Sequence, residues 1–170
     1  MIIKLCIVLL LLVIIYQDFK YLAISWWTIP ALLILAVVNG ILYSDTEQLV
    51  SGFIWNMVFL AFQFIIITLY FTIKNKQLVN ITKNYLGIGD MLFFIFLAIS
   101  FEPVHFILFF TTSLLTILLI FALLKAFRLF TNSQIPLAGG ISILYLVLLV
   151  VTTFFNYDLY SSDLINSLMF

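Results

Sequence analysis

Two aspartates are the residues of this chain that are best suited to chemistry. Asp18 closes the first apolar segment, and Asp90 opens a later one within the stretch LGIGDMLFF. Acidic side chains at membrane depth are costly, and they usually face the interior of a helix bundle or a watery cavity. When two carboxyl groups share a site, one holds a proton while the other is ionised. Such a pair can activate water against an amide bond and protonate the departing group, as in aspartic proteases.

Two glycines precede the second aspartate. Gly87 and Gly89 stand directly before Asp90 in the stretch GIGD. Glycine adopts backbone angles that are closed to other residues, and it lets another backbone approach closely. We therefore expect an extended substrate strand to lie against this turn. The simpler alternative is a helix start whose acidic residue is favoured by the helix dipole, and the spacing alone does not choose between the two.

The composition indicates that these residues lie in a membrane. Of the 170 residues, 66% are hydrophobic and 8% are charged, whereas a soluble domain carries about 25% charged residues. We therefore expect a lipid bilayer as the surroundings of the chain. The single cysteine, Cys6, excludes an internal disulfide. The sequence contains no His-Glu-x-x-His motif and no block of basic residues, so we expect neither a metal nor another cofactor, and no nucleic-acid partner.

Six segments are long and apolar enough, or nearly so, to form a transmembrane helix of about 20 residues. They cover about residues 1–18, 26–43, 49–73, 88–101, 105–124 and 139–156. The fourth segment is short, because Glu102 and Pro103 close it. The prediction is an all-α, polytopic integral membrane protein with six transmembrane helices and one domain over residues 1–170. We expect the first segment to be retained as a helix rather than removed as a signal peptide.

The positive charges predict the orientation of these helices. All lysines and arginines except Lys4 fall in loops on one side of the six-helix layout: Lys20, Lys74, Lys76, Lys83, Lys125 and Arg128. The positive-inside rule assigns this side to the cytoplasm, so that both termini face outward. Asp18 and Asp90 are then at similar depth on the cytoplasmic side, which is the minimum that they need to meet.

Three motifs, in this order, resemble the type IV prepilin peptidase family. These GxGD intramembrane aspartic proteases include the archaeal preflagellin peptidases. The motifs are Asp18-Phe19-Lys20 followed by Ile24, then Gly87-Ile88-Gly89-Asp90, then Ile135-Pro136-Leu137-Ala138-Gly139-Gly140. The resemblance covers most of the chain and implies that Asp18 and Asp90 are the catalytic pair. It also implies a multi-pass protein of the inner (cytoplasmic) membrane that cleaves the leader peptide of type IV pilin-like precursors at the cytoplasmic face.

The third motif opens the last predicted helix. We expect Pro136, Gly139 and Gly140 to form a bent helix entry that packs beside Asp90 and shapes the cleft. An ordinary helix start is the alternative, with an early proline and with glycines that permit close contact between helices.

The chain departs from the family's pattern in two places. Ser25 and Trp26 follow Ile24 where family members often have proline and asparagine, and Leu92 stands where a lysine often follows the GxGD acid. These differences concern the choice of substrate more than the acid pair. The sequence has no Cys-x-x-Cys motif, so neither the methyltransferase part nor N-methylation is expected. The rival interpretation is a non-catalytic membrane protein, either a transporter subunit or an assembly factor, with an inactive peptidase-like fold.

Overall fold

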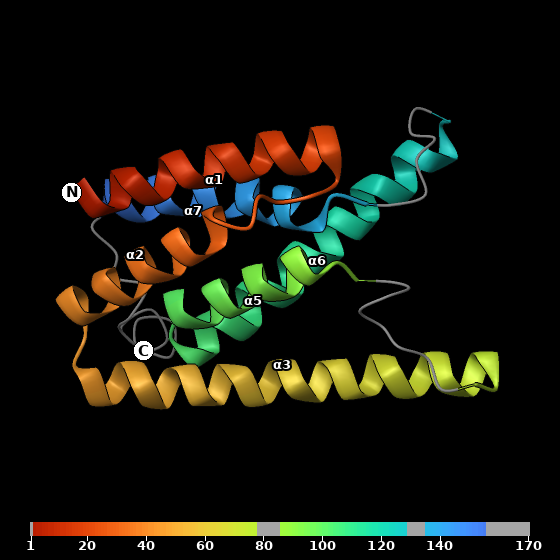
Figure 1. The fold of residues 1–170 in the computed structure, drawn as a ribbon, viewed down its shortest axis with the longest axis horizontal. Helices are drawn as coiled ribbons and strands as arrows, with labels where there is room; N and C mark the ends of the chain where they lie inside the picture. Colours follow the sequence, from red (N-terminus) through yellow and green to blue (C-terminus); the bar gives the residue numbers. More distant parts are fainter. Residues whose placement is uncertain (1, 78–85, 129–134, 156–170) are drawn as a thin grey trace.

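The computed structural model of the protein describes residues 2–77, 86–128 and 135–155, and within these ranges the regular elements are all α-helices (Figure 1). They are α1 (Ile2–Tyr21), α2 (Thr28–Tyr43), α3 (Thr46–Asn75), α5 (Ile88–Ser100), α6 (Pro103–Ala126) and α7 (Leu137–Phe155). The all-α prediction is confirmed for this part of the chain. Each of the six expected segments corresponds to one of these helices.

The helices differ in length in a way that matters for a membrane. Helices α1, α3, α6 and α7 are long and apolar enough to cross one. Helices α2 and α5 are apolar but shorter, with 16 and 13 residues. At a rise of about 1.5 Å per residue, α5 is about 20 Å long, compared with about 30 Å for the hydrocarbon layer. Helix α5 alone therefore does not reach from one side of that layer to the other.

Local signals explain where several helices begin and end. Leu22 adopts a left-handed conformation (φ 51°) after α1, and Lys76 does the same after α3 (φ 53°), which is a common way to stop a helix. Pro103 opens α6, where its missing N–H group costs nothing. Because the stop comes only at Leu22, α1 runs three residues beyond Asp18, whereas the sequence predicted an end near residue 18.

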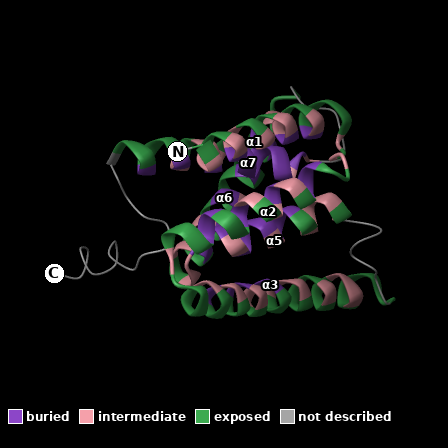
Figure 2. Ribbon diagram, turned by 60° about the vertical axis from the view of Figure 1, so that its left-hand side comes forward, coloured by how far each residue is buried: buried purple, intermediate pink, exposed green. Residues whose placement is uncertain are grey.

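Helix α5 is the centre of the bundle. It packs against α2, α3, α6 and α7. Its buried residues are Phe93, Phe94, Phe96, Leu97, Ala98 and Ser100. Phe94 meets Phe110 of α6 edge-on with 5.0 Å between the ring centroids, and Phe96 meets Tyr145 of α7 at 5.7 Å. Figure 2 shows the buried residues concentrated between the helices, while α3 is largely exposed. The outer surface is apolar, which suits lipid rather than water.

A buried side chain of α3 fastens the end of α5. The Asn56 amide Nδ2 donates to the carbonyl oxygens of Ala98 and Phe101, each at 2.8 Å. The last turn of a helix leaves carbonyl groups without a helical partner, and this amide satisfies two of them. The contact fixes α5 against α3 at the end that lies away from Asp90.

Candidate active site

The start of α7 brings Asp18 and Asp90 together. The backbone N–H of Gly139 donates to Oδ2 of Asp18 at 2.6 Å, and the N–H of Ala138 donates to Oδ1 of Asp90 at 3.2 Å. Helix α7 packs along α1 and also contacts α5, so that one helix end reaches both carboxyl groups. The two groups lie close enough for their charges to interact.

The N–H groups of Ala138 and Gly139 are available to the carboxyl groups because they lie in the first turn of α7. The first N–H groups of a helix have no helical partner, and they carry a partial positive charge. Helix α7 begins at Leu137, so Ala138 and Gly139 are its second and third residues. The N–H of Gly140 already turns back to the carbonyl of Pro136 at 3.1 Å. Two consecutive donors therefore each hold one carboxyl group, in the way that helix N-termini bind anions.

Helical spacing places Asp18 in the site. It follows Ile7, Leu11 and Ile14 on the buried face of α1, at the spacing of three and four residues that keeps side chains on one side of a helix. Only 5% of Asp18 is exposed. An acidic residue thus continues an apolar face where that face meets α7, and the N–H of Gly139 is its polar partner there.

The helix start places Asp90. Gly87 is the N-cap of α5, and Asp90 is the third residue of the helix. The half-buried Asp90 side chain faces back toward the N–H of Gly87, as an acidic residue at this position does in a capping box. The helix-start alternative therefore describes the local geometry of GIGD correctly, while the contact with Ala138 adds a link to α7.

The two glycines before Asp90 have ordinary backbone angles. None of the six glycines has a positive φ, and Gly87 lies at φ −67° and ψ 146°, which any residue adopts. Gly87 and Gly89 therefore do not use backbone angles that are closed to other residues, and that part of the expectation is wrong. The docking of a substrate strand against this turn stays a prediction. A Cβ atom at Gly87 would lie 3.2 Å from Oδ2 of Asp90, and one at Gly89 would lie 3.4 Å from Cδ1 of Ile24. Gly87 thus leaves room for the carboxyl group, and Gly89 is where the chain between α1 and α2 packs.

Gly139 is the glycine at which a side chain would disturb the site most. A Cβ atom there would lie 3.1 Å from both Cβ and Oδ2 of Asp18, and 3.0 Å from the ring of Phe19. These contacts are tighter than most real Cβ contacts, so with a side chain at this position Asp18, Phe19 or α7 would have to shift by a few tenths of an ångström. The absence of a side chain lets the N–H of Gly139 reach the carboxyl group.

The other residues of the third motif lie around this contact. Pro136 directly precedes α7 and supplies the carbonyl that the N–H of Gly140 binds. A Cβ atom at Gly140 would lie 3.0 Å from the side chain of Ile117 on α6. Gly140 therefore serves close packing between helices, as the simpler interpretation of the motif expected.

Ala138 lies within the third motif, but it was not predicted to be a residue of the site. The donor to Asp90 is its backbone N–H, and alanine has no functional side chain that would draw attention to it. The signal that could have identified it is the position, because a proline before a helix is followed by N–H groups that have no partner within the helix.

The chain between α1 and α2 closes one side of the site. The N–H of Ser25 donates to Oε1 of Gln17 at 2.8 Å, and Ile24 contacts Gly89. Trp26 is 85% exposed and Leu92 is 38% exposed. Ser25, Trp26 and Leu92 are the residues that depart from the family's pattern. None of them makes the hydrogen bonds that hold the carboxyl groups of Asp18 and Asp90.

Lys20 lies on a different side of α1 from Asp18. Its ammonium group donates to the hydroxyl of Tyr16 at 2.6 Å, and it lies over the rings of Tyr16 and Tyr21, 5.0 and 5.1 Å from their centroids. Tyr16 and Tyr21 are both exposed. Lys20 is thus bound by aromatic residues on the outer surface, where long basic side chains commonly reach toward the membrane interface.

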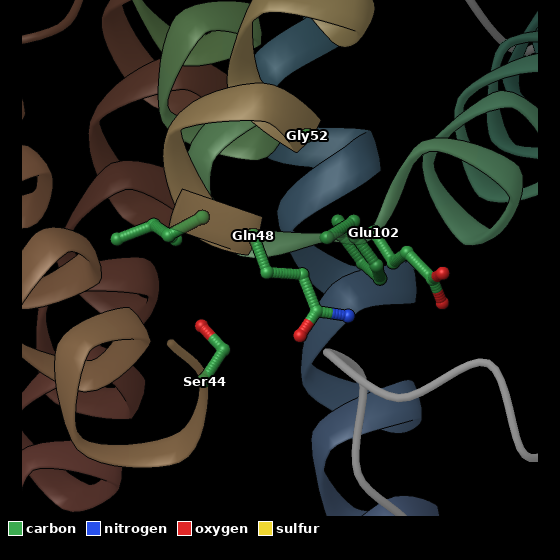
Figure 3. Close-up of a pocket in the computed structure, with 6 residues that line it drawn as sticks. Ser44, Gln48, Gly52 and Glu102 are labelled. Atoms are coloured by element: carbon green, nitrogen blue, oxygen red, sulfur yellow. The ribbon is translucent and has the colours of Figure 1, made fainter. Parts of the chain in front are cut away.

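A small pocket lies at the other end of the bundle. It is lined by Ser44, Gln48, Leu49, Gly52, Phe101 and Glu102, and Gln48 lies between Ser44 and Glu102 (Figure 3). The Ser44 hydroxyl donates to the carbonyl of Gly40 at 2.9 Å. Oε2 of Glu102 lies 3.5 Å from Nδ1 of His105. These polar groups surround the ends of α2 and α5, and they are separate from the acid pair.

The arrangement of Asp18 and Asp90 is suited to acid–base chemistry on one bound molecule. In the described ranges, no three histidine, cysteine, aspartate or glutamate side chains gather as a metal site would require. The chain matches no protein-family model, no curated protein and no solved structure. The sequence motifs and the geometry of the two carboxyl groups are therefore the basis for assigning a function.

Proposed function

We propose that the protein is a membrane aspartic endopeptidase that cleaves the leader peptide of type IV pilin-like precursors at the cytoplasmic face of the inner membrane. The observation that carries the proposal is the binding of Asp18 and Asp90 to adjacent N–H groups of α7. The resemblance of the three motifs to the type IV prepilin peptidases supplies the substrate class.

The reaction needs one carboxyl group protonated and the other ionised. The ionised group takes a proton from a water molecule, and the water oxygen attacks the carbonyl carbon of the scissile peptide bond. The protonated group hydrogen-bonds the carbonyl oxygen during the attack. The C–N bond then breaks, and a proton passes to the departing nitrogen, which gives one carboxylic acid and one amine for each water consumed. The N–H groups of Ala138 and Gly139 hold the two carboxyl groups in position beforehand.

The short α5 supports access of water to Asp90. Helices α3 and α6 have 30 and 24 residues, so they are about 45 and 36 Å long. Both extend past the start of α5 (Figure 1). The non-helical residues just before α5 thus begin between longer helices. Non-helical backbone at membrane depth is tolerated where protein buries it or where it lines a water-filled cavity, and hydrolysis requires such water.

The rival function assigns the two carboxyl groups to structure alone. The same hydrogen bonds join α1, α5 and α7, and a transporter subunit or an assembly factor would need nothing more from them. The two functions differ in what removal of the carboxyl groups does. A purely structural pair affects the amount of folded protein, whereas a catalytic pair affects the cleavage of a substrate.

Co-expression with pilin-like precursors that are encoded nearby tests the proposed function. We expect the wild-type protein to shorten a precursor from its N-terminus, measured as a loss of mass and a new N-terminal residue. A precursor that keeps its full length beside the folded protein would contradict the proposal and favour the non-catalytic alternative.

The same proposal predicts six spans with both termini outside. A reporter fused after Lys76 should lie in the cytoplasm, and a reporter at Asp45 or at the C-terminus should lie outside. Lys83 and the C-terminal tail, which belong to this prediction, lie outside the described residues. Alkaline phosphatase and green fluorescent protein fusions provide the measurement. The reverse pattern would put both carboxyl groups on the side opposite a cytoplasmic leader.

A further inference from the structure

Asp18 and Asp90 belong to two helices that make little direct contact with each other. Within the described ranges, α1 packs against α2 and α7, whereas α5 packs against α2, α3, α6 and α7. The start of α7 is one bridge between the two carboxyl groups, through its backbone N–H groups. Two carboxyl groups that act on one bound molecule need a fixed separation, so a second bridge beside them would matter for the reaction.

The chain between α1 and α2, residues 22–27, makes such a bridge and is called here the α1–α2 connection. Ser25 is held from both of its ends. Its N–H donates to Oε1 of Gln17 on α1 at 2.8 Å. Its carbonyl accepts the hydroxyl of Thr28 at 2.7 Å and the N–H of Thr28 at 3.1 Å. The α1–α2 connection is thereby fastened to α1 on one side and to the start of α2 on the other.

Ile24 carries the bridge to α5. A Cβ atom at Gly89 would lie 3.4 Å from Cδ1 of Ile24, 3.5 Å from its Cβ and 3.6 Å from its Cγ1, so the Ile24 side chain packs directly on this glycine. Gly89 precedes Asp90 in the first turn of α5. The contacts therefore run from α1, next to one carboxyl group, to α5, next to the other.

The half-buried Gln17 makes the side-chain link of this bridge to α1. The N–H of Ser25 lies in a non-helical segment, where a backbone donor needs a partner other than a helical carbonyl, and the Gln17 amide oxygen is that partner. Gln17 is also the residue directly before Asp18. Without its oxygen, Ser25 would be held from the side of α2 alone, and the α1–α2 connection could lift from Gly89.

We propose that Gln17 is a positioning residue for the acid pair. Its hydrogen bond to Ser25 holds the α1–α2 connection on the start of α5, and so fixes the separation of Asp18 and Asp90. Gln17 acts through the backbone rather than on the substrate. The inference rests on the proposed function and adds to it, because the two carboxyl groups are then set by two bridges, one from α7 and one from α1.

Disulfide closure tests the position of the α1–α2 connection without any substrate. Ile24→Cys and Gly89→Cys are introduced together in a Cys6→Ser protein. A Cβ atom at Gly89 lies 3.5 Å from Cβ of Ile24, within the range of about 3.5–4.5 Å that a disulfide needs, so mild oxidation should link the two cysteines. Adding Gln17→Met removes the accepting oxygen at similar side-chain size. It should slow closure by about 5-fold, the effect of losing one hydrogen bond.

Gln17→Glu and Ser25→Ala are the controls for closure. The first keeps a side-chain oxygen that accepts the N–H of Ser25, and the second keeps both backbone groups, so each should close at the starting rate. Cysteines that do not link, or that link equally fast with Gln17→Met, would overturn the inference. A Ser25→Ala protein that closes as slowly as Gln17→Met would also overturn it, because the hydrogen bond would then not be what holds the α1–α2 connection.

Cleavage kinetics test the effect on the acid pair, with rates measured on equal amounts of folded membrane protein. Gln17→Met should lower kcat by about 5-fold and leave KM unchanged, because the position of the carboxyl groups acts in the transition state. Oxidising the cysteine pair in the Gln17→Met protein should restore kcat to that of the oxidised pair with Gln17 intact, since the disulfide replaces the hydrogen bond. Gln48→Met, beside the small pocket at the other end of the bundle, should change neither constant.

The two measurements separate a failure of the positioning role from a failure of the proposed function. An unchanged kcat in Gln17→Met, an equal loss in Gln48→Met, or a low kcat that oxidation does not restore would overturn the positioning role alone. An unsubstituted protein that does not cleave the precursor would overturn the proposed function, and the closure rates would still decide whether Gln17 holds the α1–α2 connection.

Discussion

Replacing either aspartate by asparagine is expected to lower the rate of leader cleavage by about 10³-fold while leaving the helix bundle folded. An amide can neither take a proton from water nor give one to the departing nitrogen, and acid–base catalysis contributes rate factors of about this size. The side-chain oxygen of asparagine can still accept the N–H of Gly139 at position 18 or of Ala138 at position 90. Asp18→Asn and Asp90→Asn therefore separate the chemical role of each carboxyl group from its role in holding α7.

Glu102→Gln is the matched control for both substitutions. Glu102 lies at the opposite end of α5 from Asp90, next to the small pocket, and its amide variant should cleave the precursor at the wild-type rate. Cleavage rates are measured on equal amounts of membrane-inserted protein. An aspartate variant that keeps most of the wild-type activity would refute the proposed mechanism and leave the structural role as the remaining function of the pair.

Gly139→Ala is expected to lower the cleavage rate by about 10-fold. The added Cβ atom would lie 3.1 Å from Cβ and Oδ2 of Asp18 and 3.0 Å from the ring of Phe19. Either α7 or the Asp18 side chain must then move by a few tenths of an ångström, and because a displacement of about 1 Å at a catalytic group can cost about 100-fold in rate, this smaller shift should cost about 10-fold. Turnover should fall although both carboxyl groups are still present.

Gly52→Ala is the control for the added methyl group. A Cβ atom at Gly52 would lie 3.5 Å from Pro103, which is an ordinary van der Waals contact, so activity should not change. Thermal unfolding in detergent, followed for both variants, shows whether the loss at Gly139 exceeds any loss of stability. If Gly139→Ala cleaves the precursor as fast as Gly52→Ala does, then the close contact between α7 and Asp18 does not position the acid.

The helices could be predicted from the sequence because long apolar runs and their breaks are strong local signals. Pro103 and the break before Leu137 mark helix starts within two residues of the expected positions. The end of the first helix was predicted three residues too early, because Asp18 is polar but the stop comes from the backbone conformation of Leu22. Of the six expected transmembrane helices, four are long enough to cross a membrane, whereas α2 and α5 are shorter.

The sequence predicted which residues could form the site, but not what brings them together. Charge sorting placed Asp18 and Asp90 on one side, and the structure brings them to the same helix end. The contacts that do so are made by the backbone N–H groups of Ala138 and Gly139. Every residue except proline carries such a group, so no residue type signals it. The same limit explains the error at Gly87 and Gly89, where glycine suggested unusual angles and the backbone adopts common ones.

The hydrogen bond between Gly139 and Asp18 joins residues that are 121 positions apart. A ribosome makes α1 first and α7 last among the described helices, and synthesis proceeds at about 5–20 residues per second. For several seconds, the nascent protein therefore carries Asp18 in the membrane without the helix end that holds it. The acid pair takes its final arrangement only after residue 139 has entered the bilayer. The order of translation thus delays the pairing of the two carboxyl groups until the last described helix has been made.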